Sequence, residues 1–162
     1  MIKLQDLRVS YGTNHVLRGL TATFRPGHVY GIIGENGAGK TTFFRALAGL
    51  VGHDGIIDAP EDQLRYRLGF LQTENYFMPR LTGREYLRLL CQARGVEPRD
   101  LDARNIFDLP LDNYAETYST GMQKKLALLG VLLQDNEILI LDEPFNGVDI
   151  QSNIVISAII RE

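Results

Sequence analysis

Short apolar runs along the chain alternate with longer stretches in which apolar residues recur every three or four positions. The short runs predict strands, because alternating or continuously apolar segments of about four to eight residues suit β-sheets. They cover Ile2–Val9, Val16–Phe24, His28–Ile33, Leu68–Leu71 and Ile138–Leu141. The His28–Ile33 run is apolar and β-branched, so we expect it to be a buried parallel strand.

The longer stretches predict four helices. Three of them cover Lys40–Ala48, Gly121–Leu133 and Ile150–Ile160, and the fourth begins after Thr82 and runs to Arg94. Thr82-Gly83-Arg84-Glu85 has the spacing of a capping box, and Gly95 supplies a C-terminal stop. Residues 98–118 predict short helices and turns. Strands and helices in this order predict an α/β fold with a parallel sheet at its centre and a helical insertion.

A glycine-rich loop lies between the third strand and the first helix. Residues Gly34–Thr41 fit the phosphate-loop pattern G-x-x-x-x-G-K-[ST] at every fixed position. Glycines allow main-chain N–H groups to surround a triphosphate closely, and the following helix turns its positive dipole end toward it. Lys40 is predicted to reach the β- and γ-phosphates of ATP, and the Thr41 hydroxyl to bind Mg²⁺. The predicted nucleotide-binding residues here are Gly34, Glu35, Asn36, Gly37, Ala38, Gly39, Lys40, Thr41 and Thr42.

The apolar run Ile138–Leu141 ends in two carboxylates, Asp142 and Glu143. Ligands of open α/β sheets bind outside the carboxyl ends of the strands, so we expect both acids to project toward the phosphates. Asp142 is predicted to hold Mg²⁺, directly or through water, because this cation takes oxygen ligands. Glu143 is predicted to orient or deprotonate the water that attacks the γ-phosphate. Alone, the pair also fits a solvated acidic turn, and the phosphate loop upstream favours the catalytic interpretation.

These motifs resemble those of the ABC ATPases, and a third segment strengthens the resemblance. Tyr118–Met122 is similar to the family signature LSGGQ, with Ser119 and Gly121 retained and Tyr, Thr and Met at the other positions. A serine hydroxyl and glycine N–H groups at a helix N-terminus form an anion site. The resemblance implies that Ser119 and Gly121 contact nucleotide bound by a second such domain, in a head-to-tail dimer.

The resemblance covers nearly the whole chain and implies a fold. It is a P-loop NTPase core with a parallel central sheet, N-terminal antiparallel β-strands and a helical subdomain over about 76–118. Residues 1–162 are expected to form a single ATP-binding domain of this type. Tyr11 falls where the family places an aromatic that stacks on adenine, and Asp149 is expected to act across the dimer interface.

The metal-binding glutamine of the family has two candidates in this chain. An alignment without gaps places Thr73 at that position, and Gln72 lies one residue earlier. A shift of one residue would let Gln72 reach the metal, and without that shift the site is weakened. We favour Gln72, which gives Thr41, Gln72 and Asp142 as the predicted Mg²⁺ ligands.

The family ends its core with a further strand and a histidine that contacts the γ-phosphate. The three histidines of this chain, His15, His28 and His53, lie far upstream and are interpreted as surface or packing residues. We therefore hypothesise that the 162 residues are a truncated form of a longer domain. Such a form is expected to bind MgATP and to turn it over slowly.

The composition of the chain limits the classes of molecule that it is expected to bind. The formal net charge of −3, from 17 basic and 20 acidic residues, gives no overall attraction to nucleic acid. The apolar stretch Ile154–Ile160 is too short to cross a bilayer, and charges at Lys3, Asp6 and Arg8 leave no room for a signal peptide. The single cysteine, Cys91, is expected to be a buried residue of a helix.

The leading hypothesis is a subunit that couples ATP hydrolysis to transport. The permease must be a separate membrane protein, and the chain is expected to lie on the cytoplasmic face of the membrane. The stretch 76–118 is the expected docking surface, and Met122 is similar to signatures of simple bacterial exporters.

Two alternatives remain open at this point. One is a soluble ABC ATPase of the translation or DNA-repair type; the other is a P-loop kinase or a similar nucleotide-binding module. About a hundred residues without heptads separate Lys40 from Asp142, which disfavours the chromosome type with its long coiled coil.

Overall fold

The computed structural model describes residues 1–59, 64–98 and 100–161, which form two compact units, Met1–Leu68 and Gly69–Glu162. The α/β fold class is confirmed. The single domain predicted over 1–162 stays a prediction. Residue 99, which belongs to the predicted ranges 76–118 and 98–118, lies outside the described residues. So do residues 60–63 and 162, which belong to the predicted range 1–162.

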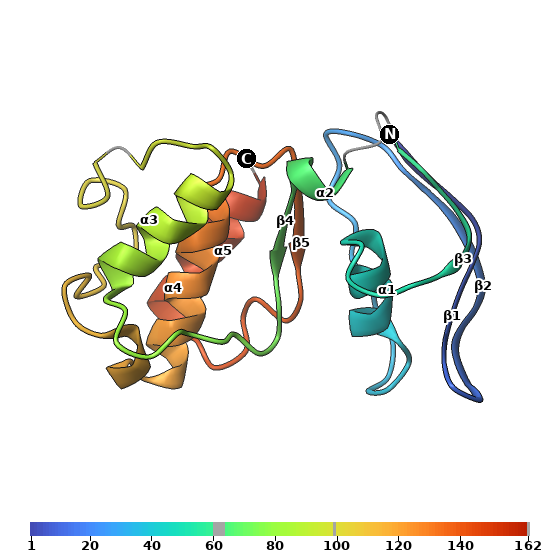
Figure 1. Ribbon diagram of the computed structural model, residues 1–162, viewed down its shortest axis with the longest axis horizontal. Coiled ribbons are helices and arrows are strands. Elements are labelled where there is room, and N and C mark those ends of the chain that lie inside the picture. The colour runs from blue at the N-terminus through green and yellow to red at the C-terminus, as the bar shows by residue number, and fades with distance from the viewer. Residues whose placement is uncertain (60–63, 99, 162) are drawn as a thin grey trace. The chain divides into compact units, whose positions relative to one another are not determined.

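In the N-terminal unit, three antiparallel strands form one sheet in the order β2-β1-β3 (Figure 1). They are β1 (Ile2–Tyr11), β2 (Asn14–Phe24) and β3 (Asp54–Asp58). The first two confirm the predicted antiparallel strands. The sequence does not predict β3, because its two apolar residues, Ile56 and Ile57, are too few to set up a pattern.

The predicted buried strand over 28–33 is wrong for this structure. These residues have no strand assignment, and Val29 and Ile33 expose 68% and 96% of their surface. Apolar, β-branched residues indicate a preference for a sheet, but a strand also needs a neighbour to hydrogen-bond with. None of the strands described in the N-terminal unit pairs with this segment. Its Tyr30 hydroxyl instead accepts a hydrogen bond from the Arg25 amide at 2.9 Å.

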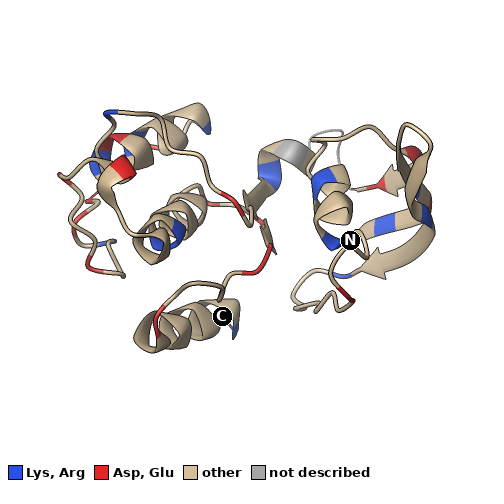
Figure 2. Ribbon diagram, turned by 90° about the horizontal axis from the view of Figure 1, so that it is seen from below, with Lys and Arg blue, Asp and Glu red and all other residues tan. Residues whose placement is uncertain are grey.

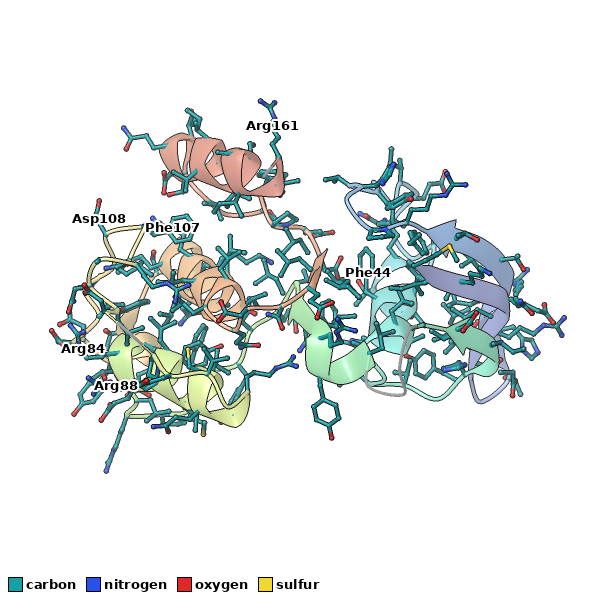
Figure 3. The ribbon with its side chains drawn as sticks, turned by 90° about the horizontal axis from the view of Figure 1, so that it is seen from above. Phe44, Arg84, Arg88, Phe107, Asp108 and Arg161 are labelled. Atoms are coloured by element: carbon teal, nitrogen blue, oxygen red, sulfur yellow. The ribbon has the colours of Figure 1, made fainter. Side chains whose placement is uncertain are left out.

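Helix α1 (Lys40–Leu47) follows the glycine-rich loop and confirms the predicted helix to within one residue. It buries Phe43, Ala46 and Leu47. The Phe43 ring lies 6.1 Å from the ring of Phe24 at the end of β2 and 5.6 Å from that of Phe44. Figure 3 labels Phe44. This apolar contact holds the helix against the N-terminal sheet. A single helical turn, α2 (Leu64–Arg67), precedes the boundary between the units.

Strand β4 (Leu68–Leu71) begins at the unit boundary and continues into the C-terminal unit. It forms a two-stranded parallel sheet with β5 (Ile138–Leu141), and both strands have their predicted bounds. The helices are α3 (Gly83–Ala93), α4 (Thr120–Leu132) and α5 (Ile150–Arg161), with a 3₁₀ turn, η1 (Ala115–Thr117), before α4 (Figure 1). One hydrophobic cluster joins these elements. Its fully buried members include Leu71, Leu87, Leu126, Leu129 and Ile156.

The predicted capping box begins α3 as expected. The Thr82 hydroxyl accepts from the Glu85 amide, and the Glu85 carboxylate accepts from the Thr82 amide at 2.9 Å. The Arg84 side chain then binds two carboxylates of the following loop, Asp102 at 2.8 Å and Asp112 at 2.7 Å. Figure 2 shows both signs of charge on α3 and this loop, and Figure 3 labels Arg84 and Arg88 on the helix. These ion pairs hold a loop that has little regular structure of its own.

Helix α4 is buried on most of its sides. Leu126, Leu129, Gly130 and Leu133 are buried, and so are residues between them, whereas Met122 is half-buried. Cys91 of α3 is buried too, as expected, and this burial raises the pKa of its thiol. Within the described ranges, no helix combines the length and the apolar character needed to cross a bilayer.

Candidate functional site

The glycine-rich loop has the backbone geometry that a phosphate cradle requires. Gly37 and Gly39 have φ angles of 84° and 93°, in the left-handed region that favours glycine. A Cβ at Gly39 would lie 2.9 Å from the side chain of Val16, so this position has no room for one. The loop closes with a hydrogen bond from the Ala38 amide to the Glu35 carbonyl at 3.2 Å.

Lys40 places its ammonium group on this loop. Its Nζ donates to the carbonyl oxygens of Gly34 at 2.7 Å and Glu35 at 2.8 Å. Gly39 caps α1 without a side-chain hydrogen bond, and the first turn of the helix holds no acidic residue. The positive end of the helix and the lysine charge therefore lie beside the same loop, with Thr41 and Thr42 in that first turn. This donor set fits a bound phosphate.

Tyr11 ends β1, and its side chain is exposed. The next residue, Gly12, has a φ of 60° and begins the turn into β2. An exposed ring at a strand end is available for stacking, and its contact with adenine stays a prediction.

The acid pair follows β5 directly, as the sequence predicts. Asp142 is only 3% exposed, whereas the Glu143 side chain is exposed. Glu143 has a φ of 51°, a left-handed backbone that is uncommon for a residue with a side chain. The Asn146 side-chain amide donates to the Glu143 carboxylate at 3.2 Å. One acid is thus enclosed and the other is exposed, on a strained turn.

The two candidates for the metal-binding glutamine position lie at the same end of the C-terminal sheet as Asp142. The Asp142 amide donates to the Leu71 carbonyl at 2.9 Å, which joins the carboxyl ends of β4 and β5. Gln72 is half-buried and Thr73 is exposed. Among the described residues, no group of three or more His, Cys, Asp or Glu side chains is arranged to hold a metal ion. A single carboxylate with hydroxyl and amide oxygens fits Mg²⁺, which proteins bind through one or two carboxylates and substrate phosphates.

A buried lysine contacts the same strand ends. Lys124 of α4 is only 6% exposed, and its Nζ donates to the main-chain carbonyl of Asp142 at 3.2 Å. It also donates to the carbonyl oxygens of Gln72 at 3.0 Å and Thr73 at 3.4 Å. Burial lowers the pKa of Lys124, and the carboxylates of Asp142 and Glu143 act in the opposite direction.

The signature-like segment forms the N-terminus of α4. Ser119 is the N-cap, and its hydroxyl oxygen accepts from the Met122 amide at 3.3 Å. The hydroxyl proton is left for an acceptor such as a phosphate. A cavity of about 290 Å³ adjoins this end of α4. It is lined by residues after β4, on α4 and after β5, among them Thr73, Thr120, Lys124, Asn146 and Gly147.

Gly121 allows α4 to approach the loop after β5 closely, and a larger residue should disturb this contact. A Cβ at Gly121 would lie 2.7 Å from the Gly147 carbonyl oxygen. We expect Gly121→Ala to destabilise the fold by about 1–3 kcal/mol, because the backbone must shift to relieve the overlap. Thermal unfolding followed by circular dichroism should then show a midpoint lower by about 3–10 °C.

A matched substitution tests this expectation. Gly52→Ala adds the same methyl group where nothing lies within 4 Å, and it should leave the unfolding midpoint nearly unchanged. Equal midpoints for Gly121→Ala and the unmodified chain would contradict the close contact.

Asp149 has two local partners in the structure. Its carboxylate caps α5 by accepting from the Ser152 amide at 2.9 Å, and it pairs with Lys125 at 3.0 Å. The Ser152 amide, and then Lys125, hold the pKa of Asp149 below its usual range. Any stability that this carboxylate supplies is therefore present above about pH 4 and is lost as the pH falls through the lowered pKa. The role of Asp149 across a dimer interface stays a prediction.

The C-terminal unit thus brings the predicted Gln72, Asp142 and Glu143 together with the N-terminus of α4. The predicted phosphate-binding residues form the loop described in the N-terminal unit. Sequence reasoning missed Lys124 and Asn146. Two adjacent lysines, Lys124 and Lys125, precede the apolar run of α4, but the sequence does not say which of them is buried or what it binds.

Known proteins with similar sequences match most of this chain. The profile of the family described as "ABC transporter" matches residues 17–146. The "Zinc import ATP-binding protein ZnuC" of Pseudomonas fluorescens is 30% identical, over 93% of this chain and 58% of its own length. The "Nod factor export ATP-binding protein I" of Paraburkholderia xenovorans is 31% identical, over 93% of this chain and 55% of its own length.

Solved structures give the same result. The "Putative ABC transporter (ATP-binding protein)" from Pyrococcus furiosus superposes with a TM-score of 0.85 at 27% identity. The match covers 98% of this chain and 84% of that structure. The chain spans about half the length of the curated relatives that it matches, with shares of 54% for two of them.

Proposed function

This chain belongs to the ABC transporter family, and from that premise we propose that it binds MgATP and hydrolyses it to drive transport through a separate membrane permease. The observation that carries the proposal is the phosphate loop. Lys40 Nζ lies 2.7 Å from the Gly34 carbonyl, beside the first turn of α1 and two glycines with positive φ angles. An anion with several oxygens suits this arrangement of main-chain amides and one ammonium group.

Each predicted site residue has a role in this proposal. The amides of the loop Gly34–Gly39 and of Thr42 bind the phosphates, and Lys40 moves from the loop carbonyls to the β- and γ-oxygens. The Thr41 hydroxyl, the Asp142 carboxylate and the Gln72 amide oxygen would hold Mg²⁺, which supplies charge neutralisation on the phosphates. Tyr11 stacks on the adenine ring.

Glu143 accepts a proton from the attacking water or orients it. Its exposed carboxylate can reach a water molecule, and the amide of Asn146 fixes one of its oxygens at 3.2 Å. The enclosed Asp142 is better suited to hold a cation than to exchange protons with water. This division between a metal ligand and a base follows from the different exposure of two adjacent carboxylates.

The proposed partners are a second nucleotide-binding domain and a permease. Ser119 and Gly121 would contact the γ-phosphate held by the second domain, because the hydroxyl proton of Ser119 and the helix N-terminus favour an anion. The permease would contact the stretch 76–118, of which residue 99 lies outside the described residues. We place the chain on the cytoplasmic face of the membrane and propose export, on the basis of Met122 in the signature.

Nucleotide titration tests the proposed function. Binding of a fluorescent ATP analogue should be saturable, should be displaced by ATP, and should tighten when Mg²⁺ is added. Phosphate release should depend on added Mg²⁺. No saturable binding of ATP would overturn the proposal.

The membrane assignment needs a separate measurement. Pull-downs with detergent-solubilised membranes and with purified ribosomes, compared at equal chain concentration, distinguish a transport subunit from a translation-type ATPase. We expect ATP-sensitive retention on the membrane fraction and none on ribosomes.

A further inference from the structure

The side chain of Lys124 connects three segments of the C-terminal unit. Its three main-chain acceptors belong to Gln72, Asp142 and Thr73, at 3.0, 3.2 and 3.4 Å from Nζ. An ammonium group has three N–H donors, so each can be used in this arrangement. The lysine itself is on α4, whose first turn carries Ser119 and Gly121.

The location of these acceptors matters more than their number. Gln72 and Thr73 follow β4, and Asp142 follows β5, at the edge where the Asp142 amide donates to Leu71. Both candidates for the metal-binding glutamine position, and the predicted aspartate ligand, are therefore held through their main chain by one side chain. The position of a main-chain atom limits where its side chain can reach.

A buried lysine is costly, and its hydrogen bonds offset that cost. Transfer of a charge out of water is unfavourable unless the charge is paired or fully hydrogen-bonded. A methionine would fill the same space without the desolvation penalty, but it would leave three carbonyl oxygens without this donor. The ammonium group therefore fixes strand ends that apolar packing alone would not hold in one register.

We propose that Lys124 is a positioning residue, which holds the main chain of Gln72, Thr73 and Asp142 from α4 so that their side chains meet the metal of MgATP. The inference rests on the proposed function, because it concerns the same nucleotide site. Lys124 acts through other residues and does not touch the substrate. Its loss should therefore affect the Mg²⁺-dependent part of nucleotide binding and leave the part due to the phosphate loop.

The test compares ATP binding with and without Mg²⁺ in the unmodified chain, Lys124→Met and Lys124→Gln. In EDTA, all three should bind the fluorescent ATP analogue with affinities equal within about two-fold, because the phosphate loop is intact. With ATP present, the Mg²⁺ concentration needed for half-maximal tightening should rise by about 10-fold in Lys124→Met, a typical cost for a residue that orients metal ligands. Lys124→Gln keeps two N–H donors and should be intermediate.

Two further measurements separate positioning from a general loss of structure. In metal-free, nucleotide-free protein, amide hydrogen exchange should accelerate in peptides covering 69–75 and 138–146 of Lys124→Met, and not in those covering β1 and β2. Where turnover is measurable, kcat should fall by about 10-fold with little change in KM for ATP. Lys3→Met removes the same charge from β1 and is the matched control, with no change expected in any measurement.

The outcomes are distinguishable. If the unmodified chain does not bind ATP, the proposed function fails. If it binds ATP with Mg²⁺ enhancement and a folded Lys124→Met shows the same enhancement, the inference alone is overturned. An equal loss of affinity in EDTA and in Mg²⁺ would also overturn it. Should Lys124→Met not fold, the comparison between Lys124→Gln and the unmodified chain decides by the same criteria.

Discussion

Replacement of Glu143 by glutamine is expected to slow ATP hydrolysis by about 10²–10⁴-fold, the usual contribution of a general base. Glutamine has nearly the same shape and still accepts a hydrogen bond from Asn146, which lies 3.2 Å from the carboxylate in this structure. It cannot accept the proton of the attacking water. Nucleotide binding should be preserved or strengthened, because an uncharged side chain no longer repels the γ-phosphate.

Phosphate release and nucleotide titration, measured on the same preparation, check this expectation. The matched control is Glu116→Gln in η1, an exposed carboxylate away from the strand ends, which should hydrolyse ATP at the unmodified rate. A Glu143→Gln chain that retains more than a tenth of the parental rate would show that another group takes the proton.

The position of the acid pair illustrates what the sequence can predict. Four apolar residues bounded by charge predict a strand, and acids directly after it must lie at the carboxyl end of that strand. The structure has β5 over the predicted Ile138–Leu141, with Asp142 and Glu143 next to it. The capping box at Thr82 was predictable for the same reason, because both of its hydrogen bonds join residues only three positions apart.

Interactions between distant residues explain what the sequence could not predict. Lys124 is separated from Gln72 by 52 positions, and no local pattern connects the two. For the segment 28–33, the sequence predicted a strand that the structure does not have. Its composition favours a strand, but pairing depends on a neighbour elsewhere in the chain. The positive φ of Glu143 is a third case, since such strain is imposed by surrounding structure and not by residue type.

Replacement of Lys40 by alanine is expected to weaken binding of MgATP by about 100-fold. The ammonium group would make charge-assisted hydrogen bonds to the β- and γ-phosphates, and each hydrogen bond to a charged group contributes about 1.5–3 kcal/mol. The free energy of two such bonds is reduced by the cost of breaking the hydrogen bonds of Lys40 to the Gly34 and Glu35 carbonyls. The remainder corresponds to a Kd that is higher by roughly two powers of ten in the variant. Calorimetric titration of the variant measures this difference directly.

Lys40→Ala should weaken nucleotide binding without lowering the stability of the folded chain. A comparison of stability with and without nucleotide therefore separates a binding role of Lys40 from a structural one. The side chain is half-buried, and its two partners are carbonyl oxygens of the loop at 2.7 and 2.8 Å, which water can bind in its place. The unfolding midpoint without nucleotide should therefore stay close to that of the unmodified chain, whereas the rise in midpoint caused by MgATP should largely disappear. Lys3→Ala, which removes the same charge and side chain from β1, should keep the full nucleotide-dependent rise. A Lys40→Ala chain that binds MgATP as tightly as its parent would mean that the phosphate loop does not hold the triphosphate.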